Sequence, residues 1–371
     1  GVLAGLAGLL QLTRPGPARL GWLLALVGLV GGLVVTHVRV RVEGGSAVDV
    51  PGWPGTSTAL IGAGMLMAAA VGFSISGAHA QSVTLYGRVV AGVDYVDHVA
   101  TANGQSNDAL RFGSNQWGIS MWGLKGDEDL GAGLHAVFNL ENMFTAGTGV
   151  SDGLFNRYAV VGLSGSSWGT ILLGRAMSLT DGEGWAIDPT GMQAMGLETL
   201  VYGRNWGPRS NAITFNSVKF GGFAFRLQTG LGNEAGNFRA NHQLSGSVSY
   251  TSGALDVRAL YEELRDANGK LSSLYGASRE YLIGGSYRIG NAKVYAGYSL
   301  IASSGEDTVA DATNPTASTR NQMEWLGINY QVNVALQLIA AVYHANVNHG
   351  GGSGTLGVIG ADYFLSKRTG L

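Results

Sequence analysis

The sequence predicts an all-β protein, a transmembrane antiparallel β-barrel, and three observations support this. The 371 residues include 60 Gly, and only 13% are charged, roughly half of the ~25% that is usual in soluble proteins. Beyond residue 80 no apolar run reaches the ~20 residues that a membrane-spanning helix needs. Apolar and polar residues alternate in segment after segment, and short connectors alternate with long ones, as in outer-membrane barrels. A large soluble β-sandwich or lectin-like protein is the alternative.

The chain before the predicted barrel divides into two parts. Residues 58–80 form an apolar stretch that ends in Ala-His-Ala, a small-x-small site, which predicts a signal peptide cleaved after Ala80. A buried helix is the alternative, but it would not stop directly before a period-2 pattern. Residues 1–57 fit no barrel and are interpreted as an upstream extension, either non-native sequence or a membrane anchor. The barrel is predicted to occupy 81–371.

Period-2 alternation defines the strands of the predicted barrel. In 244–250, for example, Leu, Gly, Val and Tyr alternate with three serines, so the two sets point to opposite faces of a strand. Small polar residues on one face favour a water-filled lumen over a sandwich core. The segments expected to form strands are 83–95, 114–125, 133–143, 157–163, 169–176, 211–220, 222–230, 242–251, 254–264, 279–289, 292–302, 322–331, 335–346 and 354–365.

The connectors between these strands alternate in length. Tight ones, such as Gly221-Gly222 and Gly290-Asn291, are typical of hairpin turns. The acidic residues Asp127, Glu128 and Asp129 are interpreted as part of a solvated turn at 126–131. The long polar connectors are expected at 96–110, 144–156, 177–208, 231–241, 265–278, 303–321 and 347–353.

Composition argues against several other classes of protein. A net charge of −2 is unfavourable for a nucleic-acid partner, and the absence of Cys excludes a disulfide scaffold or a thiol site. His344 and His349 lack metal-ligand spacing. The Gly-Leu-Ser-Gly-Ser sequence at 162–166 has no strand-to-helix turn around it. We therefore expect no enzyme activity, no cofactor and no metal site.

Several motifs, in order along the chain, resemble the general porins of Gram-negative bacteria of the Burkholderia, Bordetella and Neisseria kind. They are SVTLYGRVVAGVDY, WGLKGDEDLGAGLHAVFNLE, FNRYAVVGLSGSSWGTILLGR, RSNAITFNSVKFGGFAFRLQTG and GADYFLSKRT. The resemblance implies a sixteen-stranded barrel, of which fourteen strands are present here, and a third external loop that folds inward and narrows the pore. It also implies a homotrimer in the outer-membrane lipid. Met121 and Thr214 stand where the family often carries basic wall residues.

The resemblance places the constriction loop in the long connector 177–208. Acidic groups on such a loop, facing basic groups on the wall, create a transverse field that decides which ions pass. A solvated lumen charge without such a role is the alternative for each wall residue. The predicted loop acids are Asp181, Glu183, Asp188 and Glu198, and the predicted wall residues are Arg88, Arg157, Arg209, Arg226 and Arg258.

The predicted function is an outer-membrane porin for the passive diffusion of small hydrophilic solutes and ions. Two alternatives remain open at this point. One is a surface adhesin or receptor built on the same barrel, without a transport role. The other is a porin fragment that does not insert, because an open sheet edge in lipid leaves unpaired backbone groups that cost several kcal/mol each.

Overall fold

The computed structural model describes residues 82–100, 105–114, 118–192, 196–201, 204, 206–305, 318–349, 351–366 and 369–370. The predicted upstream extension at 1–57 and the predicted signal peptide at 58–80 lie outside these residues. From residue 82 onward the contacts form one compact unit, Ser82–Leu371.

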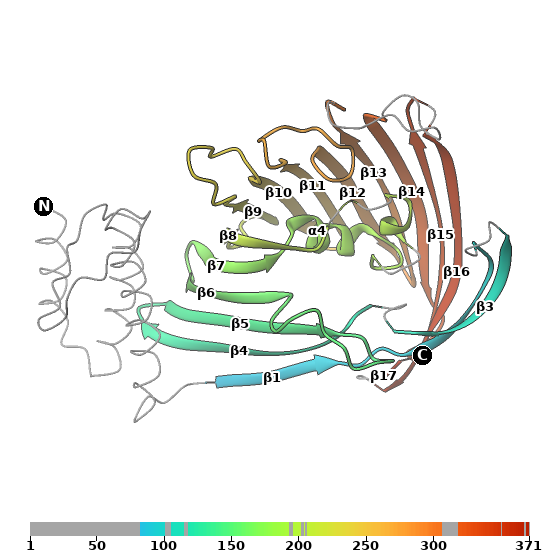
Figure 1. The fold of residues 1–371 in the computed structure, drawn as a ribbon. Coiled ribbons are helices and arrows are strands. Elements are labelled where there is room, and N and C mark those ends of the chain that lie inside the picture. Colours follow the sequence, from blue (N-terminus) through green and yellow to red (C-terminus); the bar gives the residue numbers. More distant parts are fainter. Residues whose placement is uncertain are drawn as a thin grey trace, which may run out of the picture. The chain divides into compact units, whose positions relative to one another are not determined.

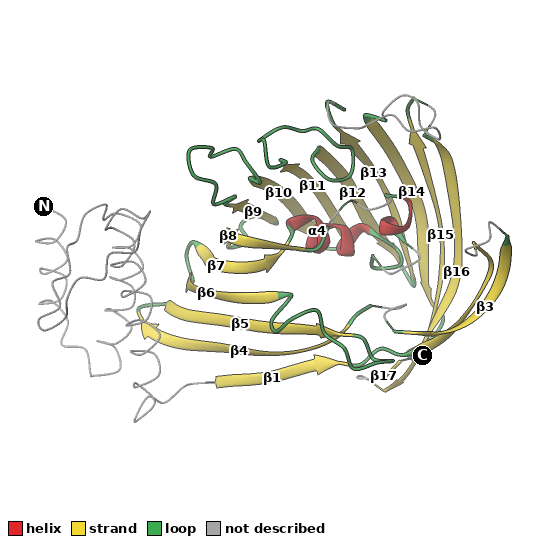
Figure 2. Ribbon diagram, in the orientation of Figure 1, coloured by secondary structure: helices red, strands yellow, loops and turns green. Residues whose placement is uncertain are grey.

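The unit consists of β-strands with two short helices in one connector (Figures 1 and 2). The helices are α4 (Leu179–Ile187) and the 3-10 helix η1 (Leu197–Leu200). The strands are β1 (Ser82–Arg88), β2 (Gly92–Ala100), β3 (Ser106–Gly113), β4 (Ser120–Gly131), β5 (Leu134–Phe144), β6 (Tyr158–Gly165), β7 (Gly169–Met177), β8 (Pro208–Ser217), β9 (Phe223–Gly230), β10 (Gln243–Ser252), β11 (Leu255–Leu264), β12 (Arg279–Ile289), β13 (Ala292–Ala302), β14 (Arg320–Gln331), β15 (Leu336–Val347), β16 (Gly352–Ser366) and β17 (Thr369–Gly370).

One antiparallel sheet contains fifteen of these strands in the order β1, β4 and then β5 to β17, and β2 and β3 form a separate hairpin. The sheet curves around the connector that carries α4 (Figure 1). Among the described residues β1 pairs only with β4 and β17 only with β16, so the sheet is open between them. The all-β antiparallel prediction and the inward-folded third loop are confirmed, but seventeen strands are present among the described residues where fourteen were predicted.

The two faces of the sheet have opposite chemistry. Leu85 is 70% exposed and Ile359 93% exposed on the convex face, whereas Glu262 and Glu280 are fully buried on the concave face. A soluble domain would bury the apolar set and expose the charged one. An apolar outward band with polar groups inside is the arrangement that suits lipid outside and water inside.

Tight turns follow the glycine pattern of the sequence. The turn between β8 and β9 contains Gly221 and Gly222, both at positive φ (57° and 91°). The turn between β4 and β5 contains Ala132 (53°) and Gly133 (74°). Two successive positive φ angles fit the right-handed twist of hairpin strands, and they fix the register of each pair.

The sequence prediction was wrong near the start of the barrel. The predicted strand 83–95 is interrupted at 89–91, and residues 106–110, predicted as loop, belong to β3. The predicted turn at 126–131 is strand: β4 continues to Gly131, with Asp127 opposite Val137 on β5. Acidic residues suggested a turn, but those on the concave face lie against water, so they do not end the strand.

Candidate functional site

The connector 178–207, between β7 and β8, enters the concave side of the sheet. Ser178 caps α4, since its hydroxyl oxygen accepts a hydrogen bond from the Asp181 N–H (3.1 Å). The helix lies against the inner faces of β9 to β13, as Figure 2 shows. Residues of the connector pack in one apolar cluster with inward residues of the wall, which include Leu179, Ile187, Leu197, Trp206, Leu260, Leu282, Met323 and Trp325. One side of the connector is therefore docked on the wall.

Glu183 brings three predicted site residues together. Its carboxylate lies 2.8 Å from Arg258 Nη1 and 3.3 Å from Arg226 Nη1. The Ser247 hydroxyl donates a further hydrogen bond to Glu183 Oε1 (2.7 Å). Glu183 itself is 1% exposed, while both arginines keep part of their side chains exposed. We call these four residues the Glu183 cluster; it fixes α4 to β9, β10 and β11.

The undocked side of the connector carries Asp181 and Trp185. The Arg88 guanidinium of β1 lies 5.8 Å from the Trp185 ring centroid, in a cation–π contact. Burial raises the pKa of Asp181, and attraction to Arg157 and Arg226 offsets part of this rise. The structure therefore brings Asp181 near the predicted wall residues Arg88, Arg157 and Arg226, across the space beside α4.

On the wall opposite Asp181, Arg157 is paired with a carboxylate that sequence analysis did not select. The Arg157 Nε donates to Glu141 Oε1, and the Tyr86 hydroxyl lies 2.7 Å from Glu141 Oε2. The alternation along 134–141 puts Glu141 on the polar face of its strand. Because Arg157 is 16 residues away along the chain, the sequence does not reveal that the two residues form an ion pair.

Asp188 occupies the interior of the connector. Its carboxylate accepts hydrogen bonds from the N–H groups of Thr190 (3.1 Å), Met192 (2.9 Å) and Leu197 (3.1 Å). The Tyr343 hydroxyl of β15 donates a fourth. Asp188 is buried, and its hydrogen bonds organise the connector and attach it to the wall.

Replacing this carboxylate should loosen the connector. We expect Asp188→Ala to increase the rate of proteolysis between 188 and 197 at least tenfold, because hydrogen bonds to a charged group contribute about 1.5–3 kcal/mol each. Limited proteolysis of the folded protein, followed by mass spectrometry, measures this rate. Tyr343→Phe, which removes one donor only, should show a smaller increase. Equal rates for wild type and Asp188→Ala would contradict the role of Asp188.

Arg209 is placed under the connector, in a buried four-charge cluster that comprises Arg204, Arg209, Glu262 and Glu280. Arg209 Nη2 lies 2.9 Å from Glu262 Oε2, and Arg204 contacts both Glu262 (3.2 Å) and Glu280 (3.0 Å). The Trp206 indole N–H donates to Glu280 (2.8 Å). All four charged side chains are at most 1% exposed. Arg209 therefore does not reach the open space beside α4, unlike Arg88.

The fourth predicted loop acid, Glu198, lies on the 3-10 helix η1. Its side chain is partly exposed and partly buried by neighbouring residues. This partial burial, together with repulsion from Asp181 and Asp188, raises the pKa of Glu198 to about 7. The carboxyl group is thus half protonated near neutral pH.

The described helices do not include an apolar one with the length of a membrane span. Nor do three His, Asp or Glu side chains converge as metal ligands in the part of the chain that the structure describes.

Comparison with known proteins gives a consistent result. Residues 65–371 match the family model described as Gram-negative porin. An outer membrane porin protein of Bordetella pertussis is 31% identical over 258 residues, which cover 60% of this chain and 65% of the relative. Outer membrane porin protein 32 of Delftia acidovorans is 32% identical, over 62% of this chain and 67% of the relative. The chain thus spans slightly less than two thirds of the Bordetella protein.

Solved structures support the same fold. The anion-selective porin from Comamonas acidovorans superimposes with a TM-score of 0.64 at 24% identity, over 78% of this chain and 86% of that one. The outer-membrane protein OmpT of Vibrio cholerae superimposes with a TM-score of 0.57 at 17% identity, over 77% and 83%. At these identities the likeness concerns the fold.

Proposed function

Since the chain belongs to the family of Gram-negative porins, we propose that it forms a water-filled channel through the outer membrane. Small hydrophilic solutes and ions would diffuse through it down their gradients, without catalysis or cofactor. The observation that carries this proposal is the inserted connector, which is docked on β9 to β13 on one side and presents charges to the opposite wall on the other. A connector that is folded this way narrows a lumen without filling it.

The charged residues then divide into two groups with different roles. We assign Asp181 and Glu198 to the loop side of the constriction and Arg88 and Arg157 to the wall side, because these side chains border the space beside α4. Opposed charges across a narrow passage act on each permeating ion. Arg226 and Arg258 contribute their partly exposed guanidinium groups from the Glu183 cluster, whereas Glu183, Asp188 and Arg209 hold the connector in place.

Single-channel recording tests the channel itself. Refolded full-length protein in a planar bilayer should show ohmic steps in KCl, and deletion of 181–186, which carries Asp181 and Trp185, should enlarge them. Absence of any conductance from protein that migrates as a folded, heat-modifiable band would contradict the proposal. Absence of the heat-modifiable band would instead favour a chain that does not insert.

Assembly and export are part of the same proposal. The family resemblance favours a homotrimer with three separate pores, which light scattering of the detergent-solubilised protein measures directly. Residues 58–80 are proposed as a signal peptide cleaved after Ala80. Amino-terminal sequencing of the protein from isolated outer membranes should then begin at Gln81.

Glu198 should make ion selectivity depend on pH near neutrality. With a pKa of about 7, the carboxyl group is roughly nine-tenths charged at pH 8 and one-tenth charged at pH 6. Acidification therefore removes most of one negative charge, worth about 0.5 kcal/mol for an ion at ~8 Å in water. Because the effect on potassium and the effect on chloride have opposite signs, we expect the potassium-over-chloride permeability ratio to fall roughly fourfold between pH 8 and pH 6, as measured by reversal potentials.

The control for this pH effect is Glu198→Gln, which should hold the ratio at its pH 6 value throughout. A matched variant, Glu234→Gln, removes a carboxylate from an exposed connector and should leave the pH dependence intact. A pH dependence that persists in Glu198→Gln would assign it to another group.

A further inference from the structure

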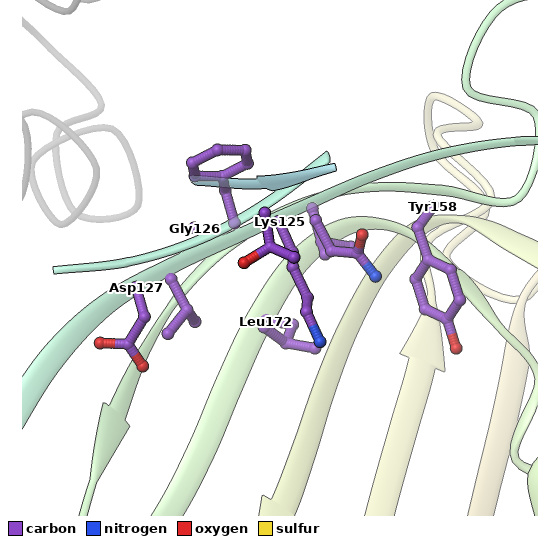
Figure 3. A pocket seen from close by; sticks show the side chains of 10 residues that line it. Lys125, Gly126, Asp127, Tyr158 and Leu172 are labelled. Atoms are coloured by element: carbon purple, nitrogen blue, oxygen red, sulfur yellow. The ribbon is translucent and has the colours of Figure 1, made fainter. Parts of the chain in front are cut away.

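A second feature of the inner wall is a hollow of about 410 Å³ on strands β1 and β4 to β7, shown in Figure 3. Volumes of this size are typical of small-molecule sites. We call it the Lys125 hollow. Its lining residues are Thr84, Lys125, Gly126, Asp127, Val137, Phe138, Asn139, Tyr158, Val160 and Leu172.

The strand register fixes the position of the Lys125 hollow relative to the constriction. Tyr86, Gly123, Glu141 and Tyr158 form one row across β1, β4, β5 and β6. Lys125 lies in the next row toward the tight turns, two residues along β4, which is about 6–7 Å away. A solute that passes Asp181 and Arg157 toward the tight turns therefore meets Lys125 next.

The hollow offers one cation without an opposing carboxylate. The Lys125 ammonium lies 5.5 Å from the Tyr86 ring centroid, and no carboxylate among the described residues forms an ion pair with it. The one carboxylate in the lining, Asp127, lies 2.6 Å from His135 Nδ1. In Figure 3 the Lys125 ammonium and the Asp127 carboxylate extend to the same side of β4 but diverge from each other.

The Lys125 hollow also contains neutral hydrogen-bond donors and apolar side chains. The Asn139 oxygen is engaged with the Tyr86 hydroxyl (2.8 Å), which leaves the Asn139 amide N–H groups as donors. The Tyr158 hydroxyl points to the same side as the Lys125 ammonium (Figure 3). Leu172, Val137 and Val160 line the hollow beside them. Inward positions that contact only water in a barrel are usually polar.

We propose that the Lys125 hollow is a binding site for organic monocarboxylates with a compact apolar body, such as aromatic carboxylates. The carboxylate pairs with Lys125 and accepts hydrogen bonds from Asn139 and Tyr158, and the apolar body covers Leu172 and the two valines. Access to the hollow through the lumen rests on the proposed channel function, but binding at equilibrium does not. Binding is weak, because a solute in a channel must also leave.

Equilibrium dialysis of the full-length protein, refolded in detergent, tests the site with radiolabelled benzoate and acetate. Benzoate should bind about tenfold more tightly than acetate, as expected for burial of one ring face. Benzylamine and benzyl alcohol, which keep the ring and lose the anionic group, should compete poorly. These comparisons use the wild-type protein alone. Equal affinity for benzoate and acetate, or strong competition by benzylamine, would overturn the proposal.

Variants identify the hollow as the place of binding. Lys125→Gln should weaken benzoate binding at least tenfold, Lys125→Arg should retain it, and Leu172→Ser should weaken benzoate but not acetate. The matched control is Lys219→Gln, which makes the same charge change at an exposed turn residue and should have no effect. Benzoate binding that is unchanged in Lys125→Gln and Leu172→Ser would place the ligand elsewhere and overturn the assignment.

Current recording separates this site from the channel function. Chloride conductance without benzoate tests the channel alone. Millimolar benzoate should reduce that conductance in the wild type and less in Lys125→Gln. A conducting protein that does not bind benzoate refutes the site and leaves the channel, whereas a protein that binds benzoate and does not conduct refutes the channel and leaves the site.

Discussion

Glu183→Gln is expected to raise the chloride-over-potassium permeability ratio of the channel roughly fourfold to fifteenfold. The substitution removes the carboxylate that Arg226 and Arg258 share. One net positive charge then appears on the inner wall, and a unit charge ~5 Å from an ion in water is worth about 0.8 kcal/mol. The interaction energy of an anion with the wall becomes more favourable by this amount, and that of a cation becomes less favourable by the same amount. The permeability ratio therefore changes by more than the permeability of either ion alone. Reversal potentials across a KCl gradient measure it.

Three variants separate charge from displacement of α4 in this experiment. Ser247→Ala removes one hydrogen bond to Glu183 (2.7 Å) without a change of charge and should alter the ratio less than twofold. The double variant Glu183→Gln with Arg226→Gln restores the net charge and should return the ratio toward that of the wild type. Glu234→Gln removes a charge in an exposed connector and should leave it unchanged. An unchanged ratio in Glu183→Gln would show that the cluster lies outside the ion path.

The strands from β5 to β16 could be predicted closely because two local signals agree there. Glycine-containing turns such as Gly221-Gly222 and period-2 alternation give the same boundaries, and 279–289 and 292–302 match β12 and β13 at both ends. Near the start of the barrel the signals conflict. Asp127 to Asp129 have the composition of a turn, but Ala132 and Gly133 have the backbone conformation of one.

For the candidate site, the sequence predicts which face of the sheet a residue lies on, but not whether that residue is exposed there. Parity correctly put Arg226 on the inner side, whereas Arg209 turns inward through a register shift between β7 and β8. Parity also cannot tell which inner positions a folded connector covers. Arg209 is buried against Glu262, whereas Arg226 remains partly exposed. Asp188 was selected for its charge, yet backbone donors surround it.

The sequence does contain a signal that shows which part of the inner wall the connector covers. Leu260, Leu282 and Trp325 occupy inward positions in strands whose inner faces also carry polar residues, and all three pack in the apolar cluster with the connector. Large apolar residues on a lumen face require something other than water to cover them. Their concentration in 255–345 therefore marks the wall on which the connector docks, while the opposite wall, formed by β1 and β4 to β6, borders the passage.

The buried four-charge cluster is where a single substitution should destabilise the protein most. In Glu262→Gln the cluster keeps two arginines and one carboxylate, so a positive charge is left without compensation at a fully buried site. Breaking a buried ion pair by removal of one partner costs about 3–5 kcal/mol. We expect a loss of this size in the free energy of unfolding in urea, measured on protein inserted in lipid vesicles, and a lower temperature for the heat-modifiable transition on gels.

Restoring the charge balance should recover much of this loss. In the double variant Glu262→Gln with Arg209→Met, Arg204 remains paired with Glu280 (3.0 Å), and no charge is uncompensated. Replacing buried charges by apolar groups of similar volume is often neutral, so at least half of the lost stability should return. Glu234→Gln, with an exposed carboxylate, should cost less than about 1 kcal/mol. If the double variant were less stable than Glu262→Gln, the arginine would contribute through packing and not through charge, and the connector would depend on its apolar cluster alone.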